Sequence, residues 1–204
     1  MHPKDISIND YDYVLPEEKI AFFPLEGRDQ SKLLIYKNDE IKEDIYLNVS
    51  NYLPAKSFLV FNDTKVINAR ILFTKLTGGI IEIFCLEPYE VINDYAVVLH
   101  KTKSVRWKCM IGGAGKWKQK FLEKKFIINN DEVTLNAQLV ERLSDAYVVE
   151  LSWEPGEYSF AEIIEHAGRT PLPPYIKRDA GERDAERYQT IYSKYEGSVA
   201  APTA

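Results

Sequence analysis

The chain has 204 residues, with 26 lysines and arginines against 31 aspartates and glutamates, so its formal net charge is −5, and 45% of its residues are hydrophobic. This composition is typical of a soluble globular protein with one or two cored domains, and its acidity argues against a protein that coats nucleic acid indiscriminately. No apolar run approaches the roughly 20 residues that span a bilayer, and residues 1–5 do not begin a secretory signal, so we expect a cytoplasmic protein with no membrane partner.

The N-terminal part of the chain predicts a few regular elements. A proline followed by acids in a first turn predicts a short helix within 13–23, which Pro24 would end. Two stretches joined by a polar turn, 32–36 and 40–46, predict a β-hairpin. The continuous apolar run at 57–61 predicts a strand that is buried on both faces.

Polar side chains follow the predicted strand at 57–61. Asn62, Asp63 and Thr64 would emerge at its C-terminal end, where α/β folds place ligands. These residue types also form turns through local hydrogen bonds, so on the residues alone a turn that caps the next element is the better interpretation. Arg70, shortly downstream, fits either a surface salt bridge or a clamp for a phosphate or carboxylate.

From residue 70 the pattern changes to short strands separated by turns. Candidate strands cover residues 71–76, 80–86, 95–100, 106–111, 125–128, 133–139 and 147–153. Their spacing of roughly 8–12 residues is typical of a small β-barrel or sandwich. We therefore expect an inserted antiparallel β-barrel over 70–154, between two parts of a main α/β domain, 1–69 and 155–204.

Basic residues concentrate between 101 and 125. Nine lysines and arginines stand there against one acid, a local net charge of nine minus one, or +8. A solvated surface explains such a run, and so does a contact with an RNA backbone; Trp107 and Trp117 favour the second interpretation because bases stack on aromatic rings. The candidate RNA-binding residues are Lys116, Lys118 and Lys120.

The segment 112–116, Gly-Gly-Ala-Gly-Lys, lies inside this basic stretch but lacks the spacing of a phosphate-binding loop. Its neighbours are predicted strands rather than a strand and a helix. We therefore interpret it as a hairpin loop.

Cysteine and histidine are scarce. Cys85 and Cys109 sit in apolar surroundings without a Cys-x-x-Cys spacing, which is typical of structural thiols, and two cysteines cannot form a disulfide framework. His2, His100 and His166 are scattered singly. Because a metal site needs several ligands close together, we expect none.

A helix is predicted after the last strand. Ser159 can cap it, Glu162 occupies the capping-box position and Gly168 would end it. The charged segment 179–187 fits either a surface helix or a loop.

A series of long motifs runs through the chain in a fixed order. They are Phe-Pro-Leu-Glu at 23–26, Arg-Asp-Gln-Ser-Lys-Leu-Leu at 28–34, Leu-Val-Phe-Asn-Asp-Thr-Lys-Val-Ile at 59–67 with Ala-Arg at 69–70, Pro-Leu-Pro-Pro-Tyr-Ile at 171–176, Tyr-Gln-Thr-Ile-Tyr at 188–192 and Gly-Ser-Val-Ala-Ala-Pro-Thr-Ala at 197–204. In order and spacing these motifs closely resemble those of the S-adenosylmethionine:tRNA ribosyltransferase-isomerase family of the queuosine pathway.

This resemblance implies a fold and an activity. The implied fold is mixed α/β, a β/α-barrel-like main domain with an inserted small antiparallel β-barrel. The implied reaction moves the ribosyl part of S-adenosylmethionine, as co-substrate, onto the 7-aminomethyl-7-deazaguanine wobble base of a tRNA and isomerises it to give epoxyqueuosine. No metal is implied, and the full-length form would be a monomer.

The resemblance also implies site residues, carried over from the motifs. The implied catalytic residues are Asp63 and Arg70. The implied substrate-binding residues are Arg28, Ser31, Asn62, Thr64, Pro174, Tyr175, Arg178, Tyr188, Gln189 and Thr203. On the residues alone, the segment at Arg28 and Ser31 fits a polar loop equally well.

The chain ends in the small apolar run at 199–204, whereas the family continues with a Gly-Leu-His-Phe segment. Chain ends are usually polar and permissive, so we expect this chain to be the front part of a longer protein, with an incomplete main domain. A function from another class is therefore an alternative: a noncatalytic tRNA-binding module whose catalytic remainder is missing.

Overall fold

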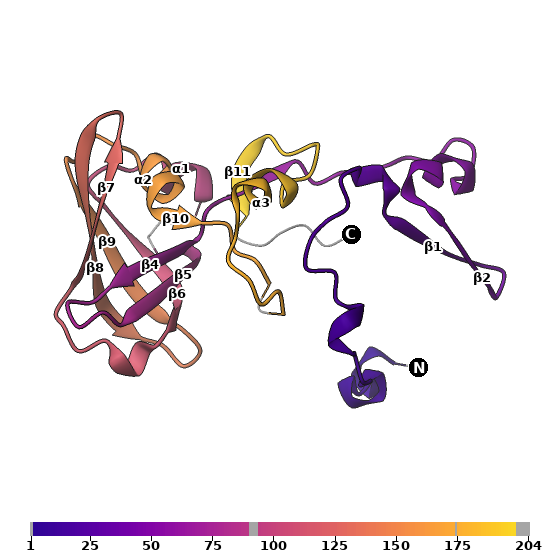
Figure 1. The fold of residues 1–204 in the computed structure, drawn as a ribbon, viewed down its shortest axis with the longest axis horizontal. Coiled ribbons are helices and arrows are strands. Elements are labelled where there is room, and N and C mark those ends of the chain that lie inside the picture. Colours follow the sequence, from indigo (N-terminus) through magenta and orange to yellow (C-terminus); the bar gives the residue numbers. More distant parts are fainter. Residues whose placement is uncertain (1, 90–93, 174, 199–204) are drawn as a thin grey trace. The chain divides into compact units, whose positions relative to one another are not determined.

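The computed structural model describes residues 2–89, 94–173 and 175–198 (Figure 1). The fold is mixed α/β, and the chain falls into two compact units. The first unit is Met1–Leu59 with Pro174–Arg178, and the second is Val60–Pro173 with Asp179–Ala204. No helix among the described residues is both long and apolar enough to cross a bilayer.

The first unit contains one β-hairpin, as predicted. Strand β1 (Lys32–Lys37) pairs antiparallel with β2 (Glu40–Ile45). The two turn residues, Asn38 and Asp39, have φ of 53° and 60°, the left-handed conformation that a two-residue hairpin turn of the right twist requires. Short 3₁₀ helices form the rest of its regular structure: Pro3–Asp5, Ile8–Tyr11, Glu17–Lys19, Arg28–Gln30 and Tyr46–Tyr52.

Two predictions for this part of the chain are wrong. The helix expected within 13–23 is only the single 3₁₀ turn Glu17–Lys19, none of whose residues is buried. A short helix needs an apolar face packed on a partner, and this turn has none among the described residues. The strand expected at 57–61 does not form either: these residues have no regular structure, and Phe58 and Val60 are 91% and 82% exposed.

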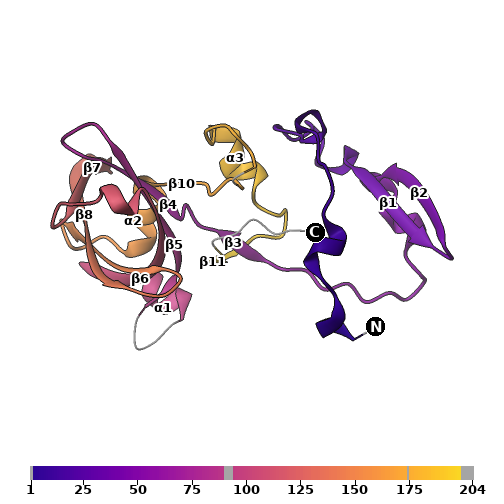
Figure 2. The same cartoon turned by 90° about the horizontal axis from the view of Figure 1, so that it is seen from below.

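The second unit is built on a seven-stranded antiparallel sheet with the order β10-β4-β5-β6-β9-β8-β7. Its strands are β4 (Arg70–Thr74), β5 (Ile80–Pro88), β6 (Ser104–Gly112), β7 (Leu122–Ile128), β8 (Asp131–Arg142), β9 (Tyr147–Glu154) and β10 (Gly168–Arg169). The sheet curls into a half-barrel, so that β7 comes into contact with β4 (Figure 2). The predicted antiparallel β-rich region is thus present as a curled sheet.

Alternation along the strands gives the curled sheet an apolar concave face. In β4, and in β5 as far as Cys85, every second side chain is fully buried, including Ile71, Phe73, Ile81 and Ile83. Side chains two apart lie on one face of a strand, so these positions form the concave face and bury its apolar area. The same alternation buries Trp107 in β6, whose ring lies 5.4 Å from that of Phe160.

Helix α2 (Phe160–Ala167) lies across one end of the curled sheet, where it contacts β4, β7 and β10 (Figures 1 and 2). The predicted capping box is confirmed: the Ser159 hydroxyl accepts from the Glu162 backbone N–H, and the Glu162 carboxylate accepts from the Ser159 backbone N–H. Its hydrogen bonds to Ser159 lower the pKa of Glu162. The helix ends at Gly168, also as predicted.

Two other elements differ from the expected ones. Residues predicted as a strand at 95–100 form helix α1 (Tyr95–Leu99), because the Asp94 carboxylate caps it by accepting from the Ala96 backbone N–H at 2.8 Å. The segment 112–116 is not a hairpin loop: it joins β6 to β7, which are not neighbours in the sheet, and contains the 3₁₀ turn Ala114–Lys116. The undecided segment 179–187 contains helix α3 (Glu182–Arg187).

The second unit also contains a separate parallel pair of strands, β3 (Thr64–Val66) and β11 (Tyr195–Ser198). Between β3 and the curled sheet runs the short connection 67–69. At this connection the Gly168 backbone comes so close that a Cβ atom on it would lie 1.8 Å from the Asn68 carbonyl oxygen and 2.5 Å from that of Ile164.

We expect Gly168→Ala to destabilise the second unit by about 1–3 kcal/mol or more, because a methyl group would overlap two backbone carbonyls that cannot move independently. Gly115→Ala is the matched control, since a Cβ there meets nothing within 4 Å. Urea unfolding of both variants measures the difference. Equal stabilities would show that the connection at Asn68 relaxes freely.

Candidate functional site

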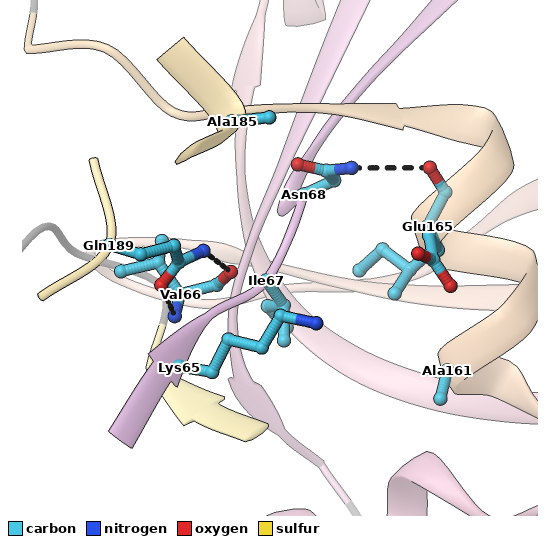
Figure 3. Close-up of a pocket in the computed structure, with 9 residues that line it drawn as sticks. Lys65, Val66, Ile67, Asn68, Ala161, Glu165, Ala185 and Gln189 are labelled. Carbon is cyan, nitrogen blue, oxygen red and sulfur yellow. Dashed lines mark hydrogen bonds between the residues drawn. The ribbon is translucent and has the colours of Figure 1, made fainter. Parts of the chain in front are cut away.

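Strand β3 is held on both edges, and this fixes the position of the polar segment beside it. On one edge β11 pairs with it, and the Ile67 N–H donates to the Ser198 carbonyl at 2.9 Å. On the other, the side-chain amide of Gln189 accepts from the Val66 N–H and donates to the Val66 carbonyl, each at 2.8 Å (Figure 3). The amide thus replaces a neighbouring strand.

The segment Asn62-Asp63-Thr64 leads into β3, whose first residue is Thr64, and does not follow a buried strand as predicted. The Asn62 side-chain oxygen accepts from the Thr64 N–H at 3.0 Å and from the Thr64 hydroxyl at 2.7 Å, which closes a local turn. The Asp63 carbonyl accepts from the N–H groups of Lys194 and Tyr195 at 2.6 and 3.2 Å. The backbone of Asp63 is therefore pinned while its side chain stays exposed.

A pocket of about 230 Å³ lies between the β3–β4 connection and α2 (Figure 3). Its lining consists of Lys65, Val66, Ile67, Asn68, Ala161, Ile164, Glu165, Ala185 and Gln189. Two of these side chains are charged, Lys65 from β3 and Glu165 from α2, whereas the apolar members Val66, Ile67 and Ile164 are almost completely buried. The lining therefore includes one cation and one anion.

Asn68 ties this pocket to its surroundings. Its amide group donates to the Glu165 carbonyl at 3.1 Å, and its side-chain oxygen accepts from the Thr170 hydroxyl at 3.3 Å. It also lines a second concavity of about 470 Å³, together with Gly168, Arg169, Thr170, Asp179, Ala180 and Gly181. One side chain thus shapes both concavities.

Arg70 begins β4 and is engaged within the sheet. Its guanidinium lies 2.7 Å from the Glu82 carboxylate and 4.9 Å from the centre of the Phe84 ring, and the side chain is only 25% exposed. Its Nε atom is buried and has no hydrogen-bond partner among the described residues. In the sheet it stands directly opposite Arg169.

The motif residues of the first unit form local contacts. The Ser31 hydroxyl donates to the Arg28 carbonyl at 3.2 Å. The Arg178 Nε donates to the Phe22 carbonyl at 2.8 Å, and its guanidinium lies 4.4 Å from the centre of the Phe23 ring. Tyr175 is exposed. Pro174 and Thr203 lie outside the described residues, and Tyr188, in the second unit, is the C-cap of α3.

Part of the basic stretch serves the structure of the sheet. Arg106 pairs with Glu150 at 2.8 Å, and Lys125 with Glu132 at 3.1 Å. The Lys124 ammonium donates to the Ala167 carbonyl at the end of α2, at 2.7 Å. Burial, with a smaller effect of Arg169, lowers the pKa of Lys124. These cations are therefore committed within the fold.

Three lysines of the stretch belong to an exposed cluster. Lys116, Lys118 and Lys120 all lie in the β6–β7 connection and are exposed. The ammonium of Lys75, from the β4–β5 turn, donates to the Lys116 carbonyl at 3.2 Å and adds a fourth charge beside them. These four residues are called the lysine cluster below.

The prediction that Trp107 and Trp117 could stack on RNA bases is wrong. Trp107 and Trp117 are buried in the core of the second unit, with 0% and 7% exposure. Alternation along β6 places Trp107 on the concave face, so its ring is not available to stack on a base.

The cysteines are buried structural thiols, as predicted. Cys85 and Cys109 are directly opposite each other in β5 and β6, and both are free and fully buried. Burial raises the pKa of the Cys109 thiol well above its ordinary value, which keeps it protonated and unreactive. Among the described residues no three or more His, Cys, Asp and Glu side chains gather as a metal site would require.

Sequence reasoning did not identify Lys65, Asn68 or Glu165 as lining residues. Lys65 lies inside the motif at 59–67, and Asn68 directly follows this motif. Their place in or beside the motif is the sequence feature that could have indicated a role in the site. Glu165 carried no such signal, because only the packing of α2 brings it to the pocket.

Comparison with known proteins gives a consistent result. The family described as queuosine biosynthesis protein matches residues 8–204. The chain is 35% identical to the S-adenosylmethionine:tRNA ribosyltransferase-isomerase of Chlorobaculum parvum over 97% of its own length and 51% of that protein. It is 38% identical to the enzymes of that name from Geotalea uraniireducens and Fusobacterium nucleatum, over 98% and 97% of its length and 53% and 51% of theirs. The chain thus spans about half the length of the curated relatives it matches, and no solved structure matches it at a comparable level.

We expect Gln189→Glu to loosen β3, because a carboxylate can still accept from the Val66 N–H but cannot donate to the Val66 carbonyl. Protection of the Val66 amide against hydrogen exchange should fall by roughly 10- to 100-fold, the cost of one unsatisfied buried acceptor. Gln138→Glu, at an exposed position of β8, is the control. Unchanged protection at Val66 would mean that β11 alone holds the strand.

Proposed function

Because the chain belongs to the queuosine biosynthesis protein family, we propose that it takes part in transferring and isomerising the ribosyl moiety of S-adenosylmethionine onto tRNA. The observation that carries this proposal is the match over residues 8–204, together with relatives that all bear the name of this enzyme. The structure adds that motif segments far apart in the sequence, 62–70 and 188–198, are neighbours around β3.

The proposed acceptor is the 7-aminomethyl-7-deazaguanine wobble base of a tRNA, and the proposed product is epoxyqueuosine. S-adenosylmethionine is the co-substrate, adenine and methionine leave, and no metal takes part. The positive sulfonium acidifies the protons on the adjacent carbons, so a single positioned base can generate the carbanion. What the protein must then supply is orientation and proton transfer.

Asp63 is proposed as the proton-transfer residue, supported by its pinned backbone and exposed side chain beside β3. Arg70, which begins β4 and is paired with Glu82 at 2.7 Å, is proposed to act with it. Gln189 is proposed to act by positioning, since both halves of its amide bind Val66. The other proposed substrate-binding residues are Arg28, Ser31, Asn62, Thr64, Pro174, Tyr175, Arg178, Tyr188 and Thr203.

We assign the parallel pair β3 and β11 to a β/α-barrel-like main domain, formed from 1–69 and 155–204 with 70–154 inserted. Parallel strands occur almost only in larger α/β sheets that are covered on both faces, and this supports the assignment. A monomer in the cytoplasm, where tRNA is modified, is the proposed state of the full-length protein.

The lysine cluster is the proposed contact with the tRNA backbone. It is supported by the exposure of Lys116, Lys118 and Lys120, and by the fact that neighbouring cations such as Arg106 and Lys125 are neutralised by carboxylates. Phosphate contacts release counterions, so they give binding a salt dependence that grows with their number.

Replacing Lys116, Lys118 and Lys120 together with glutamine should weaken tRNA binding for every tRNA sequence. The slope of log affinity against log salt should flatten by roughly one unit for each phosphate that the protein no longer neutralises. The control replaces three lysines of the first unit, Lys32, Lys37 and Lys42. If both triple variants change the slope equally, the lysine cluster makes no special contact.

The activity is tested by incubating the chain with S-adenosylmethionine and tRNA that carries the modified base, and measuring the adenine released. In a full-length version of the protein, Asp63→Asn should reduce turnover by about 100-fold or more, as loss of a proton-transfer group does. Asp10→Asn is the control. Salt-dependent tRNA binding without adenine release would instead support the noncatalytic tRNA-binding module.

A further inference from the structure

Two aromatic rings form an exposed pair beside the start of β3. The ring centres of Phe61 and Tyr192 lie 4.3 Å apart, with 36° between the ring planes. Phe61 is 51% exposed and Tyr192 is 43% exposed, so the contact between them leaves much of each ring open to solvent. These two residues are called the ring pair below.

Backbone hydrogen bonds hold the two segments of the ring pair together. The Asp63 carbonyl, shortly after Phe61, accepts from the N–H groups of Lys194 and Tyr195 at 2.6 and 3.2 Å. The same two segments continue into β3 and β11, which lie side by side with Thr64 opposite Tyr195 (Figure 2). Because both segments are pinned next to the rings, little freedom is lost when a flat ligand binds there.

A lysine lies close to the ring pair and carries a positive charge. Lys194 is exposed, and its ammonium lies 5.0 Å from the centre of the Tyr195 ring. A ring face attracts an ammonium without neutralising its charge, so Lys194 can still attract a phosphate. Exposed aromatic faces beside a cation are the combination with which proteins bind single-stranded nucleic acid, since bases stack on the rings and the cation meets the backbone.

The charge beside the rings favours RNA over the co-substrate. The adenine of S-adenosylmethionine is also flat, but this molecule has a net positive charge and no phosphate, so Lys194 repels it. A nucleotide of an RNA strand brings a base for the rings and a phosphate for the ammonium. Bases in a duplex are already stacked on one another, so only an unpaired base can use the ring pair.

We propose that the ring pair stacks on an unpaired base of the tRNA loop that carries the modified nucleotide, with Lys194 on a neighbouring phosphate. The identity of the RNA rests on the proposed function. A base on Phe61 places the loop beside the exposed side chain of Asp63. The ring pair takes no part in the chemistry and positions the loop. Stacking accepts any base, so this contact holds the loop without reading its sequence.

Binding of two RNA probes by the 204-residue chain tests the proposal. One probe is a hairpin with the anticodon loop of a tRNA, and the other is the duplex of its stem alone. Phe61→Leu and Tyr192→Leu should each raise the Kd for the hairpin by about 5-fold or more, the effect of losing one base–ring contact, and leave the Kd for the duplex unchanged. Tyr192→Phe keeps the ring and should keep the Kd.

The salt dependence separates stacking from charge. The leucine variants should lower hairpin affinity by the same factor at every salt concentration. Lys194→Gln leaves the ring pair intact and should flatten the slope of log affinity against log salt by about one unit. Tyr13→Leu, at an exposed tyrosine of the first unit, is the control and should change neither quantity.

Several results would overturn the proposal: no binding of the hairpin, unchanged hairpin affinity in both leucine variants, or equal weakening of hairpin and duplex. If Tyr192→Leu weakens S-adenosylmethionine binding but not hairpin binding, the ring holds the adenine of the co-substrate instead. If the chain is a dimer in sedimentation and the leucine variants are monomers with unchanged hairpin affinity, the ring pair joins two copies instead.

Failure of the stacking site and failure of the proposed function give different results. If the leucine variants weaken hairpin binding selectively while a full-length version of the protein releases no adenine, the stacking site stands and the proposed function fails. If adenine is released and the leucine variants bind the hairpin as the unsubstituted chain does, the proposed function stands and the stacking site is wrong.

Discussion

The close approach of Gly168 to the Asn68 carbonyl is the contact on which the rest of the second unit depends. Because Gly168 has no side chain, the chain can leave α2 and pair with β4 at once, so that the helix covers the end of the curled sheet. The same turn brings Thr170 and the end of α2 to the Asn68 amide. Both concavities are lined by Asn68, and their shape therefore follows from one backbone contact.

The polar residues of the motifs divide into two groups by what their side chains do. Asn62 and Thr64 bond to each other and close a turn, and Gln189 bonds to the Val66 backbone, so these residues build the scaffold around β3. Asp63 differs, because only its backbone is used and its side chain is presented outward. A motif near a site thus contains residues that shape it as well as residues that can act in it.

The basic stretch divides in a similar way. Exposed ion pairs such as Lys125 with Glu132 add little to stability, but they remove charge from the surface potential. Lys124 is half-buried and binds the Ala167 carbonyl, the last of α2, a favourable place for a cation at a helix C-terminus. Lys116, Lys118 and Lys120 of the lysine cluster stay exposed at the β6–β7 connection, so an acidic chain carries a local basic surface there.

The sequence by itself determined those features that local patterns encode. The hairpin at β1 and β2 follows from a turn that accepts left-handed backbone, the strands of the curled sheet from period-two alternation, and α2 from its capping box. Prediction from the sequence failed for short apolar runs without a helix or strand periodicity. Residues 57–61 have no strand partner among the described residues, and residues predicted as a strand at 95–100 form a helix because Asp94 caps it. Only the tertiary structure decided the pocket, since Lys65 and Glu165 are far apart in the sequence and line the same pocket through the packing of α2 on the sheet. Local periodicity reports which face of an element is apolar, but it carries no information on which distant element will cover that face.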